Sequence, residues 1–93
     1  TKIMKRIFKY QLPILEEVEL RLPINAEVIR IADLGGIIWL WAIIDDEDPD
    51  ETRKFYLYKT GGAMKDVPMK YLGCGAVFIQ MELMLYVFEE VSS

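Results

Sequence analysis

The sequence has 93 residues, of which 53% are apolar, 11 are basic and 15 are acidic, giving a formal net charge of −4. This length predicts one domain, residues 1–93, and the negative charge argues against nucleic acid as the partner, because nucleic-acid-binding domains carry a basic face. Histidine is absent. Its absence excludes Ser-His-Asp and Cys-His catalysis as well as zinc sites with imidazole ligands.

The cysteine and hydropathy patterns indicate where the protein acts. A single cysteine, Cys74, forms no intrachain disulfide, which is typical of a reducing compartment. Residues 1–10 alternate charged and apolar side chains, unlike a secretory signal, and the longest apolar run, Ile37 to Ile44, is too short to span a bilayer. We therefore expect a cytoplasmic protein without a membrane partner.

The first part of the chain alternates with a period of two residues, which is typical of half-buried strands. Lys5 to Leu12 predicts a first strand, which Pro13 ends because proline lacks an amide donor. Glu17 to Leu22 alternates more regularly and predicts a second strand, which Pro23-Ile24-Asn25 breaks.

The next two strands form a predicted hairpin. Glu27 to Leu34 is followed by Gly35-Gly36, a pair that suits a two-residue turn because glycine tolerates positive φ angles. The fourth strand, Ile37 to Ile44, is apolar on both faces, so it is either covered on both sides or lines an interface.

The acidic stretch Asp45 to Glu51 predicts a loop. Asp46, Asp48 and Asp50 alternate as in the first half of a calcium-binding loop. However, Glu51 stands where such a loop needs glycine, and Leu57 stands where it needs glutamate. We therefore expect a solvated loop and no metal site.

The last third of the chain completes the predicted sheet. Arg53 to Lys59 predicts a strand, Ala63 to Pro68 forms one short helical turn or none, and Met69 to Ile79 with Met81 to Glu89 forms a final strand pair. Gly73-Cys74-Gly75 indicates a bulge or a close backbone approach. A helix over Phe78 to Glu90 is the alternative.

Together these elements predict an all-β domain, with α+β as the variant that a short helix would produce. About seven short strands at regular spacing favour a small antiparallel sandwich or barrel.

Aromatic side chains on the second face of these strands are the candidate binding residues. Such a face would offer large contact area to a ligand or partner. Beside it, Arg53, Lys59 and the Thr60 to Gly62 backbone suit an anion. The predicted ligand- or partner-binding residues are Trp39, Trp41, Arg53, Tyr56, Tyr58, Lys59, Thr60 and Gly61.

Short blocks along the chain resemble a family of small proteins of unknown function encoded by tailed bacteriophages. The blocks are Ile7-Phe8-Lys9-Tyr10, Leu22-Pro23, Leu40 to Asp45, Thr60-Gly61, Tyr71-Leu72-Gly73 and Tyr86 to Glu89. The family's two histidines correspond to Gly62 and Tyr86, so functions that need imidazole are not carried over. The resemblance implies an accessory protein in the cytoplasm of a bacterial host.

Two functional hypotheses follow, both of binding without catalysis and without a cofactor. In the first, a homo-oligomer sequesters a small anionic ligand of nucleotide type and thereby counters host defence, with aromatic rings stacked on bases. In the second, the aromatic face and the acidic loop dock on a host protein and block it. A minor virion component is a third possibility. Enzymatic activity is not expected, because no pair of groups for acid–base chemistry is evident.

Overall fold

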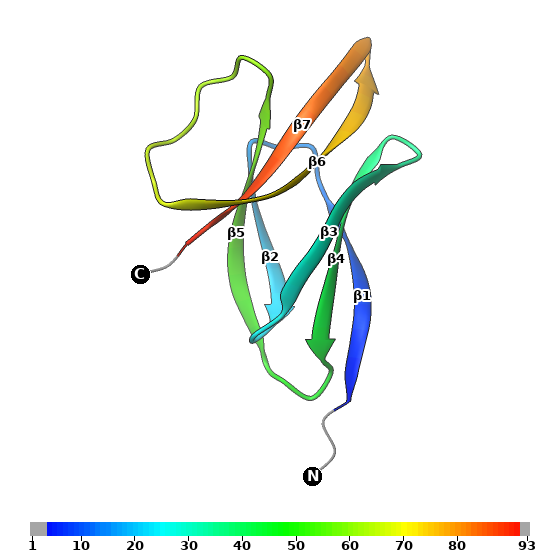
Figure 1. Cartoon of the computed structure of the whole chain (residues 1–93), viewed down its shortest axis with the longest axis vertical. Helices are drawn as coiled ribbons and strands as arrows, with labels where there is room; N and C mark the ends of the chain where they lie inside the picture. The colour runs from blue at the N-terminus through cyan, green and yellow to red at the C-terminus, as the bar shows by residue number, and fades with distance from the viewer. Residues whose placement is uncertain (1–3, 92–93) are drawn as a thin grey trace.

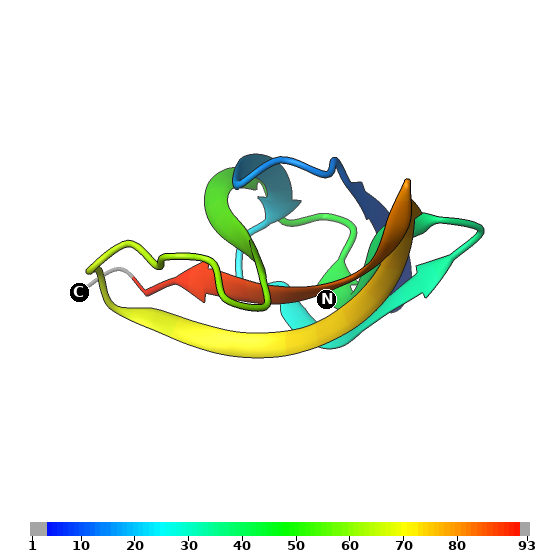
Figure 2. The ribbon, with the colours of Figure 1, turned by 90° about the horizontal axis from the view of Figure 1, so that it is seen from above.

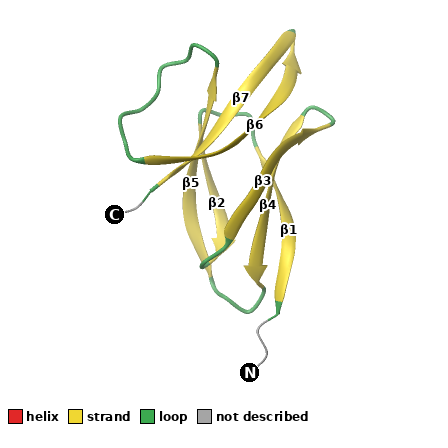
Figure 3. Cartoon of the chain, in the orientation of Figure 1, coloured by secondary structure: helices red, strands yellow, loops and turns green. Residues whose placement is uncertain are grey.

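The computed structural model describes residues 4–91, which form seven β-strands and no helix (Figure 3). The strands are β1 (Lys5–Leu12), β2 (Glu17–Pro23), β3 (Glu27–Leu34), β4 (Ile37–Asp45), β5 (Asp50–Lys59), β6 (Met69–Ile79) and β7 (Met81–Glu90). The all-β prediction is confirmed, and the stretch from Phe78 to Glu90 is strand and turn rather than helix. The segment between β5 and β6 contains no helical turn.

The strands form two antiparallel sheets that pack as a sandwich (Figure 1). The first sheet has three strands in the order β1-β4-β3, and the second has four in the order β2-β5-β7-β6. Because β1 and β2 belong to different sheets, the segment between them crosses from one layer to the other at one end of the sandwich.

The core lies between the two sheets, and its buried cluster consists of apolar side chains. In β4 every second residue is buried, and Ile38, Leu40 and Ala42 have no exposed surface. Phe55 and Leu57 of β5 pack against them from the second sheet, in one cluster that also includes Val87. This strict alternation places the other residues of β4 on the outer face of the three-stranded sheet.

The turns match the sequence pattern, although the acidic loop is shorter than predicted. Gly35 and Gly36 have φ angles of 59° and 79°, as a type I′ hairpin turn requires. The strands on either side of the acidic loop extend to Asp45 and from Asp50, because the Asp48 amide donates to the Asp45 carbonyl at 3.0 Å and closes a tight turn.

β6 bends so that it closes one side of the sandwich against β3. Its pairing with β7 shifts register between Tyr71 and Gly73, where Gly73 has a φ angle of 154°. At Gly75 an added Cβ would lie 2.9 Å from Cδ1 of Ile38 and 3.1 Å from the backbone nitrogen of Asp33. The predicted bulge and close backbone approach are both confirmed. Figure 2 shows β6 and β7 as a curved strip that reaches toward β3.

Candidate functional site

Trp39 and Trp41 lie side by side on the outer face of the three-stranded sheet. They alternate with the buried residues of β4, and both are half-buried. Ile37 and Ile43 of the same strand share this face. An antiparallel sheet with one solvent-facing side normally carries polar residues there, so four large apolar side chains in one row indicate a contact surface.

Two basic side chains lie over the tryptophan rings. The Lys9 ammonium is 4.3 Å from the centroid of the Trp39 ring, and the Arg30 guanidinium carbon is 5.2 Å from that of Trp41. They come from opposite sides, because β1 and β3 flank β4 and both Lys9 and Arg30 pair with Trp41. Each cation–π contact contributes about 0.5–1 kcal/mol at an exposed site.

We define the tryptophan face as the outer surface of this sheet around the two rings. It comprises Ile7, Lys9, Arg30, Ile37, Trp39, Trp41 and Ile43. The two charged side chains at its centre are both cations, whereas the carboxylates of this outer face, Glu27 beside Ile43 and Asp45 at the end of β4, lie at its edge. The centre of the tryptophan face therefore combines aromatic contact area with positive charge, on a chain whose formal net charge is −4.

Tyr56 and Tyr58 lie on the outer face of the other sheet and are not exposed. Their rings stack at 6.0 Å with an interplanar angle of 1°. The segment between β5 and β6 covers them, and its Lys65 amide donates to the Tyr58 hydroxyl at 3.0 Å. They are 0% and 5% exposed, so they offer no free ring face for stacking on a ligand.

Polar contacts hold Tyr56 within the sheet and fix the covering segment to it. The Tyr56 hydroxyl donates to the Glu90 carboxylate at 2.5 Å, and this bond, together with burial, raises the pKa of Tyr56 to about 12. The Lys65 ammonium donates to Glu17 at 2.9 Å, which raises the pKa of Lys65 and lowers that of Glu17. Tyr56 and Tyr58 therefore have a structural role, because both hydroxyls form hydrogen bonds within the fold.

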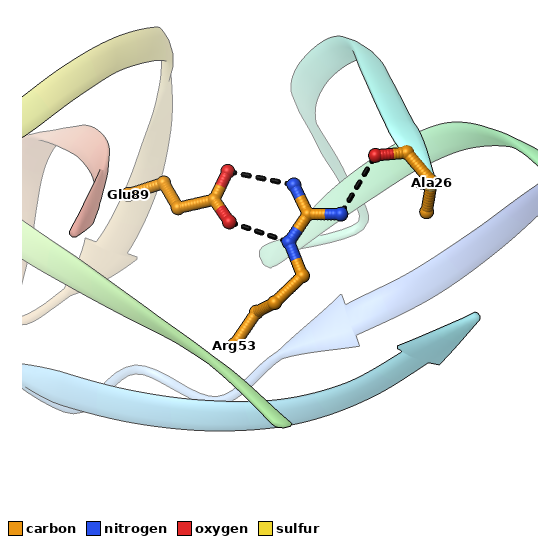
Figure 4. Close-up of polar contacts among 3 residues, drawn as sticks. All are labelled: Ala26, Arg53 and Glu89. Atoms are coloured by element: carbon orange, nitrogen blue, oxygen red, sulfur yellow. Dashed lines mark hydrogen bonds and ion pairs between the residues drawn. The ribbon is translucent and has the colours of Figure 1, made fainter. Parts of the chain in front are cut away.

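Arg53, predicted as a phosphate ligand, lies between the sheets at one end of the core (Figure 4). Its Nε and Nη2 donate to the two carboxylate oxygens of Glu89 at 2.5 and 2.8 Å, and its Nη1 donates to the Ala26 carbonyl at 2.6 Å. The bond to Glu89 raises the pKa of Arg53 despite partial burial. Because all three guanidinium nitrogens donate to protein oxygens, Arg53 serves the fold rather than a ligand.

Lys59 is the last residue of β5, and Thr60 and Gly61 form the turn that follows it. The Gly62 amide donates to the Lys59 carbonyl at 2.9 Å, and Gly61 has a φ angle of 83°. The Thr60 hydroxyl lies 3.5 Å from the Tyr86 hydroxyl. Since the Gly62 amide is used within the turn, the predicted anion-binding backbone lacks one of its donors.

The structure thus brings the predicted residues together in two separate groups. Trp39 and Trp41 share one outer face, whereas Tyr56 and Tyr58 share the opposite one, with Arg53 between the sheets. Lys9 and Arg30 were missing from the predicted set. Lys9 could have been found from the alternation of β1, but Arg30 follows a register shift in β3 that no sequence pattern marks.

Within residues 4–91 no three Cys, Asp or Glu side chains gather as metal ligands would. Over the same residues no helix is long and apolar enough to cross a membrane.

The model of a protein family described as a domain of unknown function, DUF7352, matches residues 4–93. The chain therefore belongs to this family. Comparisons with curated proteins and with solved structures find no match.

Proposed function

We propose that this member of the DUF7352 family is a binding protein without catalytic activity, which docks on an acidic surface of another protein through its tryptophan face. The observation that carries the proposal is the outward-facing pair Trp39 and Trp41 with Lys9 and Arg30 over their rings. Tryptophan and arginine are the side chains that most often dominate binding energy at protein interfaces.

The shape of the tryptophan face favours a macromolecule over a small ligand. It is the open outer side of a three-stranded sheet, and four pockets on the described residues all lie away from both tryptophans. Small-molecule sites are concave and enclose most of the ligand surface. Sequestration of a nucleotide-type ligand has less support, because Arg53, Tyr56 and Tyr58 are all engaged within the fold.

The charge pattern supports an acidic partner. Lys9 and Arg30 lie above the centre of the tryptophan face, where no acidic side chain of β1, β3 or β4 pairs with Trp39 or Trp41. Opposite potentials across an interface speed association and exclude wrong partners. The resemblance to phage proteins makes a protein of the bacterial host the partner that we propose, with inhibition of that protein as the consequence.

The experiment compares the wild-type protein with a Trp39→Thr/Trp41→Thr double variant, both tagged and purified from bacteria. Threonine suits an exposed strand position, so the variant keeps the sheet. A host protein retained only by the wild type is then purified, and its affinity for both proteins is measured by calorimetry. We expect at least about a tenfold loss in the variant. A Lys9→Glu/Arg30→Glu variant should bind more weakly than the wild type at low salt, and the difference should shrink as salt is added.

Tyr71→Ser is the matched control, because Tyr71 is an exposed aromatic residue on the four-stranded sheet and should leave binding unchanged. Equal binding by the wild type and the tryptophan double variant would overturn the proposal. So would a rise in the melting temperature of the purified protein with nucleotides, combined with failure to retain any host protein, since that pair of results favours sequestration.

A further inference from the structure

A second apolar surface lies at the end of the sandwich where the chain crosses from β1 to β2. Ile14 and Leu15 of the crossing segment are exposed there, and Leu15 is 60% exposed. They line one open groove together with Leu83 and Leu85 of β7. Figure 2 shows the crossing segment and β7 on opposite sides of this end of the molecule.

The tip of the hairpin formed by β6 and β7 lies next to this groove, because Leu83 lines the groove and Met81 is two residues closer to the tip on the same strand. Val77 pairs with Leu83 and Ile79 with Met81, and the burial of Val77 shows that this face of the hairpin points toward the core. Ile79 and Met81 are nevertheless exposed, Met81 by 63%. We call the set Ile14, Leu15, Ile79, Met81 and Leu83 the apolar end.

The hairpin tip has little support from the rest of the fold. The pairing of β5 with β7 stops at Lys59 and Leu85, so residues 81–84 pair only with β6. A two-stranded hairpin in water is marginally stable unless an apolar face of it is covered. The tip would therefore be stabilised by a molecule that binds over Ile79 and Met81.

The charges at the groove make this surface complementary to itself. Glu16 and Lys59 both line the groove, both are exposed, and neither belongs to an ion pair of the described residues. A twofold axis through the apolar end would bring Lys59 of one copy toward Glu16 of the other, twice in the same interface. A different protein whose facing surface carries charges of one sign would instead be repelled by either Glu16 or Lys59.

We infer that the apolar end is the contact surface between two copies of this chain, arranged around a twofold axis. Each copy covers the exposed side of the other's hairpin tip, with the Glu16 and Lys59 pairs at the rim. Such a contact would add buried apolar surface to a chain of 93 residues, whose own core is small. It is independent of the tryptophan face, which lies on the outside of the other sheet.

The test is sedimentation velocity of the full chain from about 1 µM to about 1 mM, a range that covers moderate and weak dimers. We expect the wild type to form dimers with rising concentration and Met81→Lys to stay monomeric. Phe78→Lys is the matched control, because Phe78 is 75% exposed on the opposite face of the same hairpin. It should dimerise like the wild type, and circular dichroism verifies that each variant is folded.

A charge exchange then tests the twofold arrangement. Lys59→Glu should weaken the dimer by about three- to tenfold in Kd, as expected for two exposed ion pairs, and adding Glu16→Lys should restore it. A wild type that is monomeric throughout overturns the inference. It is also overturned if Met81→Lys and Phe78→Lys behave alike, or if the double charge variant binds no better than Lys59→Glu.

Discussion

Arg53 and Glu89 form a two-point ion pair across the four-stranded sheet, although 36 positions separate them in the sequence. Both side chains are largely buried, with 17% and 15% of their surface exposed, and the Ala26 carbonyl accepts a further bond from Arg53. The pair closes one end of a core that is otherwise apolar, so the loss of either partner leaves a poorly hydrated charge.

We therefore expect Arg53→Met to lower the free energy of unfolding by about 2–3 kcal/mol, because Glu89 would remain desolvated without its partner. Urea unfolding measures the change as a shift of the midpoint at constant slope. Arg6→Gln is the control, since the Arg6–Asp46 pair is exposed and contributes about 0.5 kcal/mol or less. Equal midpoints for the two variants would contradict a structural role for Arg53.

The sequence was sufficient to predict the strands and their faces, because alternation and turn residues are local signals. Pro13 and Pro23 marked the ends of β1 and β2, Gly35-Gly36 marked the turn between β3 and β4, and the period of two placed Trp39 and Trp41 opposite the buried residues of β4. The two strands beside the acidic loop were predicted too short, because charged residues such as Asp50 extend the pairing at a solvated sheet end.

The composition of the candidate site could not be predicted to the same extent, because it depends on contacts between remote segments. Nothing near Arg53 in the sequence indicates that its guanidinium forms an ion pair with Glu89. Nothing near Tyr56 indicates that the segment around Lys65 folds back over it. Aromatic and basic residue types were therefore grouped into one site, whereas the structure distributes them over two outer faces and the interior.

The hydroxyl of Tyr56 should make stability fall at alkaline pH. Its pKa is raised from 10.0 to about 12 in the folded protein, mainly because it donates to the Glu90 carboxylate. A raised folded pKa means that its stabilising contribution is complete below pH 10 and is lost as the pH rises through 12. Urea midpoints measured across this range should fall more steeply for the wild type than for Tyr56→Phe.

Glu90→Gln provides the companion measurement, because it keeps the shape of the side chain and removes its charge. Titration of the tyrosinate absorbance should then show one tyrosine that ionises at lower pH than in the wild type. An unchanged titration curve would mean that the hydrogen bond to Glu90 does not raise the pKa of Tyr56.

Gly75 should resist substitution because β6 approaches β3 closely there. An alanine Cβ would meet Cδ1 of the fully buried Ile38 at 2.9 Å and the backbone of Asp33 at 3.1 Å. We expect Gly75→Ala to lower the free energy of unfolding by about 1–3 kcal/mol through overpacking. Gly36→Ala, where φ is 79° and the Cβ would meet open space, should cost only about 1 kcal/mol from backbone strain. If urea unfolding showed a larger loss of stability for Gly36→Ala than for Gly75→Ala, the close approach of β6 to β3 would be contradicted.

The tryptophan face can be probed without knowledge of the partner, because Trp39 and Trp41 are the only tryptophans of the chain. Both rings are half-buried and lie within 4.3 and 5.2 Å of a cation, so an anionic quencher should be concentrated near them. We expect the ratio of iodide quenching to caesium quenching to be about twofold higher for the wild type than for Lys9→Glu/Arg30→Glu at matched ionic strength. Without quencher, the emission spectrum of this variant should be that of a folded protein. If neither ion quenches, another molecule covers the tryptophans in solution. The same assay repeated after dilution would show whether that molecule is a second copy of the chain.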